Sequence, residues 1–172
     1  MSPGSASASV FGLADAASAA EHARSTEVPA RDPLALVREA GDLGPVFFWQ
    51  DGEETCIALG ALEVVEAEGP GRFAQADARF RALHAERPEL RGLRWFGGFA
   101  FEDTAEPGPF RAFGALRFVL PAIVWRRRAG AGAASVHMPL AADRDGGLWP
   151  RALAWARSEP RSPRPYAAGA RV

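Results

Sequence analysis

Acidic side chains in turns and loops are the first residues here whose types could catalyse a reaction. Glu53 and Glu54 lie in a polar turn, and Glu102 and Asp103, with Glu106, lie in a loop that contains proline and glycine. Paired carboxylates serve general acid–base catalysis or bind Mg²⁺. Acids in exposed loops are mostly solvated, so both groups are expected to be surface residues. Glu102 is the better catalytic candidate because it directly follows a strand.

The histidines and the cysteine give weaker evidence for catalysis or metal binding than the acidic residues do. His22, His84 and His137 are scattered without a pair at metal-ligand spacing, which favours structural histidines. Cys56 is the only cysteine, so an intrachain disulfide and a multi-cysteine metal site are excluded. Its apolar neighbours predict a buried, inert thiol. No Ser/His/Asp grouping follows from spacing, and the residues alone predict no catalytic, cofactor-binding or metal-binding position in this chain.

Binding motifs for phosphate, nucleic acid or membrane are also weak. Gly69-Pro70-Gly71 stands between a strand and a helix, but the proline removes an amide and no Gly-Lys-Ser/Thr follows, so we expect an ordinary turn. The run 126–128 is three arginines on a chain of net charge −1, which predicts a solvated strand end rather than a nucleic-acid patch. No apolar run approaches the ~20 residues that span a bilayer. No basic region precedes the N-terminal Ala/Ser stretch, so we expect a cytoplasmic protein without a membrane partner.

The 172 residues have the length of one domain. Residues 1–30 are expected to be a mobile Ala/Ser-rich tail, residues 31–158 an α+β domain, and residues 159–172 an irregular Pro/Arg-rich tail. Helices are expected at 32–38, 72–85 and 148–157, and strands at 46–50, 55–59, 62–67, 93–101, 116–127 and 133–138. Clustered hairpins with packed helices argue for an α+β fold of layered β-sheet with flanking helices, rather than a doubly wound parallel sheet.

Four details of these elements are testable against a structure. Asp32 and Asp145 are expected to cap the first and last helices. Arg72 is expected on the polar face of the second helix. Pro121 cannot donate to a β-ladder, so it should lie at a bulge or an unpaired stretch. The pair Gly97-Gly98 interrupts an aromatic strand, which marks a bulge, a bend or a place where another group packs on bare backbone.

Four stretches together resemble a known family: 47–49 (Phe-Phe-Trp), the helix 72–83, the strand 95–101 (Trp-Phe-Gly-Gly-Phe-Ala-Phe) and 118–121 (Phe-Val-Leu-Pro). In order and spacing they are similar to the N-terminal portion of isochorismate synthases. These belong to the chorismate-utilising enzymes, with the anthranilate, aminodeoxychorismate and salicylate synthases. The resemblance covers about half of the chain. It implies a partial anthranilate synthase component I-like fold, completed by a larger C-terminal half.

The resemblance also implies an activity, the Mg²⁺-dependent conversion of chorismate to isochorismate for menaquinone or siderophore/salicylate synthesis. In the family a lysine acts as general base, a glutamate acts as general acid, and further glutamates hold Mg²⁺, all in the C-terminal half. No residue of this chain matches those positions, and none of its 20 basic residues is a lysine. Arginine cannot replace the base, because it stays protonated in proteins.

We therefore expect an N-terminal segment of an isochorismate-synthase-like enzyme, from a truncated, split or frameshifted gene. It should be inactive alone, hold no cofactor itself and bind chorismate only when a separate C-terminal half completes it. Mg²⁺ is implied for the complete enzyme alone. The alternative is a non-catalytic binding or interaction module that reuses this half-fold. An exposed apolar face would favour the first reading, because half of a shared core leaves such a patch.

Overall fold

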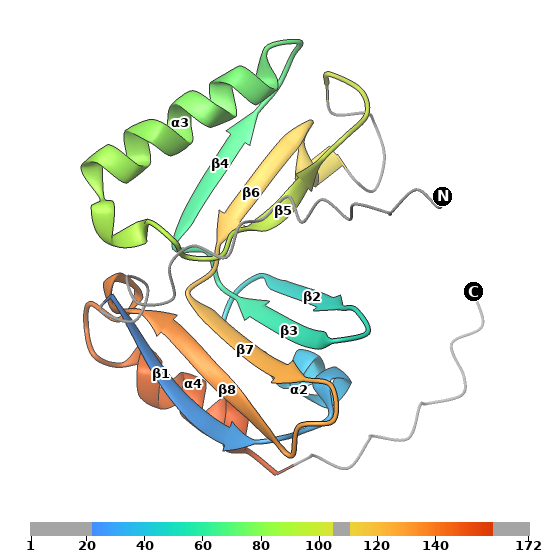
Figure 1. The fold of residues 1–172 in the computed structure, drawn as a ribbon, viewed down its shortest axis with the longest axis vertical. Helices are drawn as coiled ribbons and strands as arrows, with labels where there is room; N and C mark the ends of the chain where they lie inside the picture. The colour runs from blue at the N-terminus through green and yellow to red at the C-terminus, as the bar shows by residue number, and fades with distance from the viewer. Residues whose placement is uncertain (1–21, 105–110, 160–172) are drawn as a thin grey trace, which may run out of the picture.

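Two antiparallel sheets form the framework of the molecule (Figure 1). The computed structural model describes residues 22–104 and 111–159. Within these ranges, no helix is long and apolar enough to cross a bilayer. The arrangement confirms the expected α+β class, with layered sheet and flanking helices.

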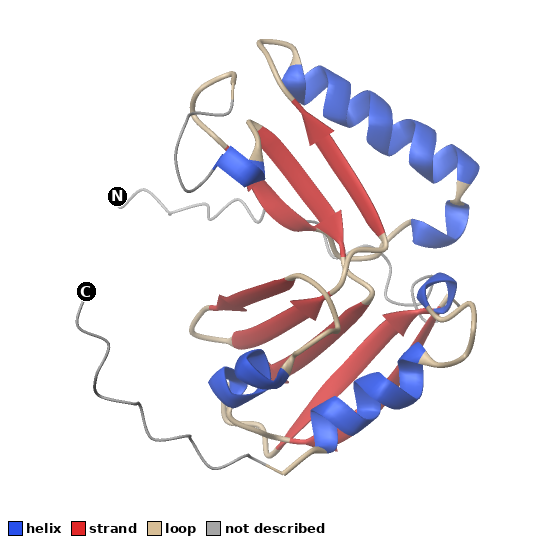
Figure 2. Ribbon diagram, turned by 180° about the vertical axis from the view of Figure 1, so that it is seen from behind, coloured by secondary structure: helices blue, strands red, loops and turns tan. Residues whose placement is uncertain are grey.

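The larger sheet, sheet A, has five strands. Their order is β1 (Ala23–Pro29), β8 (Ala133–Pro139), β7 (Ile123–Arg128), β3 (Glu54–Leu59) and β2 (Val46–Gln50). Helices α2 (Pro33–Glu39) and α4 (Leu148–Arg157) cover one face of it (Figure 2). Strand side chains alternate between the two faces, so one set from each strand meets these helices. Ile57, Trp125, Val136 and Trp155 belong to the resulting core.

The smaller sheet, sheet B, has three strands. Their order is β4 (Glu63–Ala67), β6 (Leu116–Leu120) and β5 (Phe96–Phe99). Helix α3 (Arg72–Glu86) packs on one face through Ala76 and Phe80, which meet Val65 and Phe118. Short 3₁₀ helices complete the chain: η1 (Pro88–Leu90), η2 (Arg111–Phe113) and η3 (Leu140–Ala142).

Two chain segments pass between the sheets, and one corrects the expected long strand at 116–127. That strand is divided at Pro121 into β6 in sheet B and β7 in sheet A. Beside the proline, the amide of Leu62 donates to the carbonyl of Leu120 (2.8 Å), and the amide of Ala122 donates to that of Leu59 (3.0 Å). Pro121 thus lies in an unpaired stretch, as predicted, and there the chain changes sheets.

The N-terminal boundary is a second correction. Strand β1 falls within residues 1–30, which we expected to be a tail, yet it pairs along its length with β8. The sequence of β1 does not show the apolar alternation typical of a strand, because most of its side chains are exposed and only Val28 is buried in the core. The rest of that tail up to residue 21, and residues 160–172, lie outside the described residues.

Helix ends agree with expectation at one helix and not at another. The Asp32 carboxylate accepts from the amide of Leu34 (3.1 Å), so Asp32 caps α2 as predicted. Asp143, not Asp145, serves α4, since its carboxylate accepts from the amide of Leu148 (2.8 Å). The loop before α4 turns back far enough to bring the earlier aspartate to the helix, which spacing along the sequence does not reveal.

Candidate functional site

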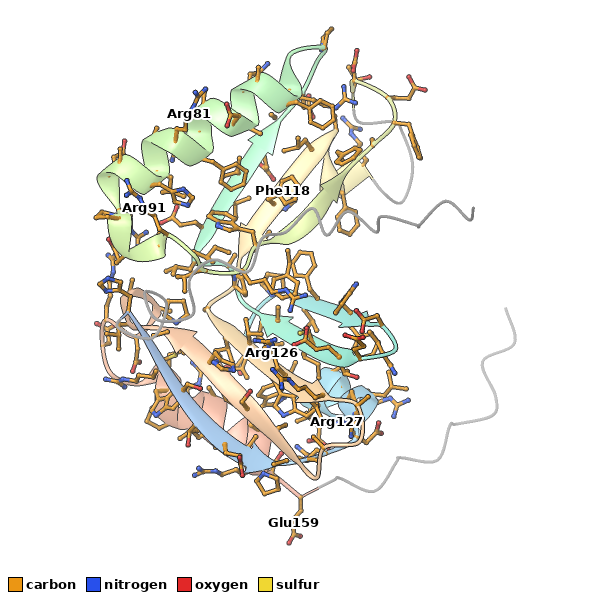
Figure 3. All side chains as sticks on the ribbon, in the orientation of Figure 1. Arg81, Arg91, Phe118, Arg126, Arg127 and Glu159 are labelled. Atoms are coloured by element: carbon orange, nitrogen blue, oxygen red, sulfur yellow. The ribbon has the colours of Figure 1, made fainter. Side chains whose placement is uncertain are left out.

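The open face of sheet A, opposite α2 and α4, carries a group of polar side chains. Residues on β3 and β7 that point away from the helical core include Glu54 and Arg126, and those on β8 include Ser135 and His137. We call these four residues the polar row. They come from three adjacent strands and border an open depression of about 600 Å³. Figure 3 labels Arg126 on β7, near the middle of the sheet.

Glu54 is the centre of an ion cluster. One carboxylate oxygen accepts from Arg94 (2.8 Å), and the other accepts from Arg126 (2.5 Å). Burial would raise the pKa of Glu54, but the hydrogen bonds from the two guanidinium groups outweigh it, and the pKa is lowered. Glu54 is therefore an ionised acceptor whose two oxygens are both engaged, which suits charge pairing better than proton transfer.

Arg94 links this cluster to sheet B. It precedes β5, and its guanidinium lies over the rings of Trp49 on β2 (5.1 Å) and Phe96 on β5 (5.4 Å). Burial would lower the pKa of Arg94, but its hydrogen bond to Glu54 leads the contacts that raise it. Phe47 also meets Phe96, with ring centroids 6.3 Å apart. One arginine and three aromatic rings thus join the edges of the two sheets.

Ser135 and His137 form the other part of the row. The Ser135 hydroxyl lies 2.8 Å from Nε2 of His137. Burial lowers the pKa of His137 and the nearby Arg126 charge lowers it further, so both effects favour the neutral form of the ring. A hydroxyl within hydrogen-bond distance of an imidazole is the arrangement of a nucleophile–base pair. No carboxylate in the described residues orients this ring, so the third group of a triad is missing from that part of the chain.

The other acidic candidates lie apart from the polar row. Glu53 and Glu102 are exposed. Asp103 pairs with Arg72, which is buried on α3 rather than on the polar face where we expected it. Arg72 also donates to the carbonyls that follow β5, so it faces the strand end and not solvent. Glu106 lies outside the described residues.

The structure places the three histidines apart from one another and the cysteine in the interior. His22 precedes β1 and His84 lies on α3, so neither joins His137. In the described ranges no three His, Cys, Asp or Glu side chains gather to hold a metal ion. Cys56 is fully buried, which confirms the predicted burial, and this burial raises the pKa of its thiol to about 11.

The glycine and arginine motifs have structural explanations as well. The Gly69 carbonyl accepts from the amide of Arg72 (3.1 Å), which is an ordinary turn at a helix start. In the run 126–128, Arg126 pairs with Glu54 and Arg127 reaches the carbonyl of Arg31 (3.4 Å), so only the strand end is a solvated charge.

Gly97 is where the aromatic strand needs bare backbone. A Cβ on Gly97 would lie 2.1 Å from the carbonyl oxygen of Arg117 and 2.6 Å from Cα of Phe118. A Cβ on Gly98 would have nothing within 4 Å. The expectation of close packing is confirmed at the first glycine, and the second is spatially free.

Sequence reasoning missed Arg94 and Ser135. Ser135 could have been identified from the sequence, because residues two apart on a strand share a face and His137 was already a candidate. No pattern in the sequence identifies Arg94, since its partner Glu54 is 40 residues away and on the other sheet.

Comparison with known proteins shows to which family the sequence of this chain belongs. The model of a family described as chorismate binding enzyme matches residues 13–159. No curated protein sequence matches the chain. Among solved structures, the chain is similar to MenF, the menaquinone-specific isochorismate synthase from Escherichia coli, with 23% identity and a TM-score of 0.47. That match covers 80% of this chain and 30% of the MenF chain.

Proposed function

Because this chain belongs to the chorismate binding enzyme family, we propose that it supplies the N-terminal portion of an isochorismate-synthase-like enzyme. Such an enzyme converts chorismate to isochorismate, for menaquinone or for siderophore or salicylate synthesis. The family match over residues 13–159 carries the proposal. The strand around Gly97, whose close packing the structure explains, is one of the stretches that point to isochorismate synthases within the family.

We propose further that the reacting groups come from another polypeptide segment, continuous with this chain or separate from it. A general base must exchange its proton near neutral pH, and the family's lysine has no counterpart among the 20 arginines here. Glu54, the most buried acid on the open face, has both oxygens occupied by guanidinium groups.

Magnesium belongs to that other segment in this proposal. Mg²⁺ is bound through carboxylates together with water and substrate oxygens. Among the described residues no three His, Cys, Asp or Glu side chains come together to hold a metal ion, which supports this assignment. The role of the present chain is then to pack against the segment that binds chorismate and metal.

An activity assay with two components tests the proposal. The purified chain is incubated with chorismate and Mg²⁺, alone and with the C-terminal segment of an isochorismate synthase added as a separate polypeptide. We expect no isochorismate from the chain alone and turnover from the mixture, with the added segment alone as the control.

Two results would contradict the proposal. Turnover by the chain alone, above a reaction without enzyme, would show that it holds its own catalytic groups. If the mixture gives no more turnover than the added segment alone, and the two polypeptides do not co-elute, a non-catalytic binding module is favoured instead.

A further inference from the structure

Two members of the polar row, Ser135 and His137, take no part in the ion cluster around Glu54. They lie two residues apart on β8, so their side chains share the open face of sheet A. Both residues are half-buried, and both border the depression of about 600 Å³. A small molecule that enters this depression can therefore reach the hydroxyl and the imidazole together.

The contact between these two side chains has the geometry that activates a hydroxyl. The Ser135 oxygen lies 2.8 Å from Nε2 of His137, which is hydrogen-bond distance. A serine hydroxyl is a weak nucleophile until a base takes its proton. Burial and the Arg126 charge favour the neutral imidazole, and this is the form that can accept the proton. His137 thus holds a base against the hydroxyl in the folded chain.

Arg126 adds a positive charge beside the same hydroxyl. It faces Ser135 across the ladder of β7 and β8, where directly opposite Cβ atoms lie about 4.5–5.5 Å apart. Its Nε and Nη2 both pair with one oxygen of Glu54, so Nη1 takes no part in that ion pair. Donors near the position where negative charge develops stabilise the transition state of acyl transfer. The guanidinium is therefore placed to stabilise an oxyanion that forms at Ser135.

We propose that Ser135 and His137 form a nucleophile–base pair that reacts with esters of short-chain carboxylic acids, with Arg126 beside the oxyanion. The Ser135 oxygen bonds to the ester carbonyl carbon while Nε2 of His137 takes the hydroxyl proton. As the tetrahedral intermediate collapses, the bond from carbon to the alcohol oxygen breaks, and the imidazolium returns the proton to the departing alcohol. Water then attacks the acyl-serine by the same route and releases the acid.

The surroundings of the pair define the substrate class and the step to measure. The depression is open, and two glutamates and two arginines border it, so its charges balance and favour a small neutral ester. No carboxylate of the described residues bonds to the His137 ring, and disabling the aspartate of a complete triad lowers kcat by about 10⁴-fold. Acylation of Ser135 is therefore a better readout than steady-state turnover.

Mass spectrometry after reaction with p-nitrophenyl acetate tests the proposal on the full chain. We expect an acetyl group on Ser135, formed together with an equal amount of p-nitrophenol. His137→Gln keeps a polar side chain but removes the base, so acetylation of Ser135 should slow at least tenfold, since general-base catalysis contributes about 10²–10⁴. His84→Gln is the matched control, because it makes the same substitution on α3, and it should leave the rate unchanged.

Two further measurements separate the folded geometry from misfolding and from intrinsic reactivity. Circular dichroism checks that each variant is folded, and the chain unfolded in urea should lose the reaction at Ser135. An unmodified Ser135, equal acetylation of the exposed Ser25, or an unchanged rate in His137→Gln would overturn the proposal. None of these measurements uses chorismate or a second polypeptide, so the activity assay above can fail while this site stands.

Discussion

Substituting the two adjacent glycines of β5 separately tests the account of this strand. Gly97→Ala adds one methyl group against the backbone of β6, and Gly98→Ala adds the same group into open space. Neither glycine has a positive φ, so conformational freedom does not distinguish them. The difference between the two variants therefore measures the close approach of β5 to β6.

The magnitude follows from the contact distances. A Cβ at 2.1 Å from the Arg117 carbonyl oxygen is far inside van der Waals contact, and the obstacle is backbone that cannot rotate away. Forcing extra atoms into a packed site costs about 1–3 kcal/mol, so we expect the upper end, about 3 kcal/mol, for Gly97→Ala. Gly98→Ala should be neutral or stabilising by roughly 0.5 kcal/mol, because alanine loses less conformational entropy on folding.

Urea unfolding followed by tryptophan fluorescence measures both free energies of unfolding. For a chain of this length, about 3 kcal/mol corresponds to a melting temperature lower by roughly 6–12 °C. Equal stability of the two variants would refute the reasoning, as would a greater loss in Gly98→Ala. Far-UV circular dichroism confirms that both variants keep their strands before unfolding.

Two further predictions concern charged side chains. Arg31 is buried and donates to the carbonyl of Trp155 (3.0 Å) and to Glu39 (2.9 Å), so Arg31→Met should lower the free energy of unfolding by about 3 kcal/mol. Arg151→Met, which breaks an exposed pair, should cost less than about 1 kcal/mol in the same urea titration, and equal losses would contradict the assignment. Burial opposes ionisation of Glu54, but its arginine partners hold its pKa below the ordinary 4.5. The ion pairs of Glu54 therefore add to the free energy of unfolding above pH 4.5, and this stabilisation is lost as the pH falls through the lowered pKa. Unfolding titrations from neutral to acid pH should therefore show a shallower acid loss for Glu54→Gln than for the unmodified chain, and parallel curves would contradict this.

Local patterns in the sequence predicted the elements whose signals are strong. The Asp32-Pro33 start of α2, the hairpin of β2 and β3, and the span of α3 depend on turn residues and apolar spacing within a few positions. The close packing at Gly97 was also predictable in general terms, because a glycine inside an aromatic strand usually marks a bulge, a bend or a close approach of backbone.

The rest depends on contacts between distant residues. Strand β1 has one buried side chain and forms only because β8, more than 100 residues later, offers an edge. The continuous apolar run around Pro121 looks like one strand, since the proline's effect depends on which sheet each side joins. Arg72 lies on the polar side of a helical projection but is buried by the chain that follows β5. Ser135 and His137 could be paired from their spacing on one strand, but their meeting with Glu54 could not, because β3 lies far from β7 and β8 along the chain.

The choice of arginine explains how the open face of sheet A stabilises the fold. Glu54 receives two guanidinium groups from different sheets, and Arg94 stacks on rings while it donates. A planar guanidinium combines stacking with directed donation, which an ammonium group does not. The same group cannot release its proton near neutral pH, so it cannot serve as a general base. Replacing Arg94 with lysine should therefore weaken the contact between the sheets while leaving the charge unchanged, which separates geometry from charge as the property this face requires.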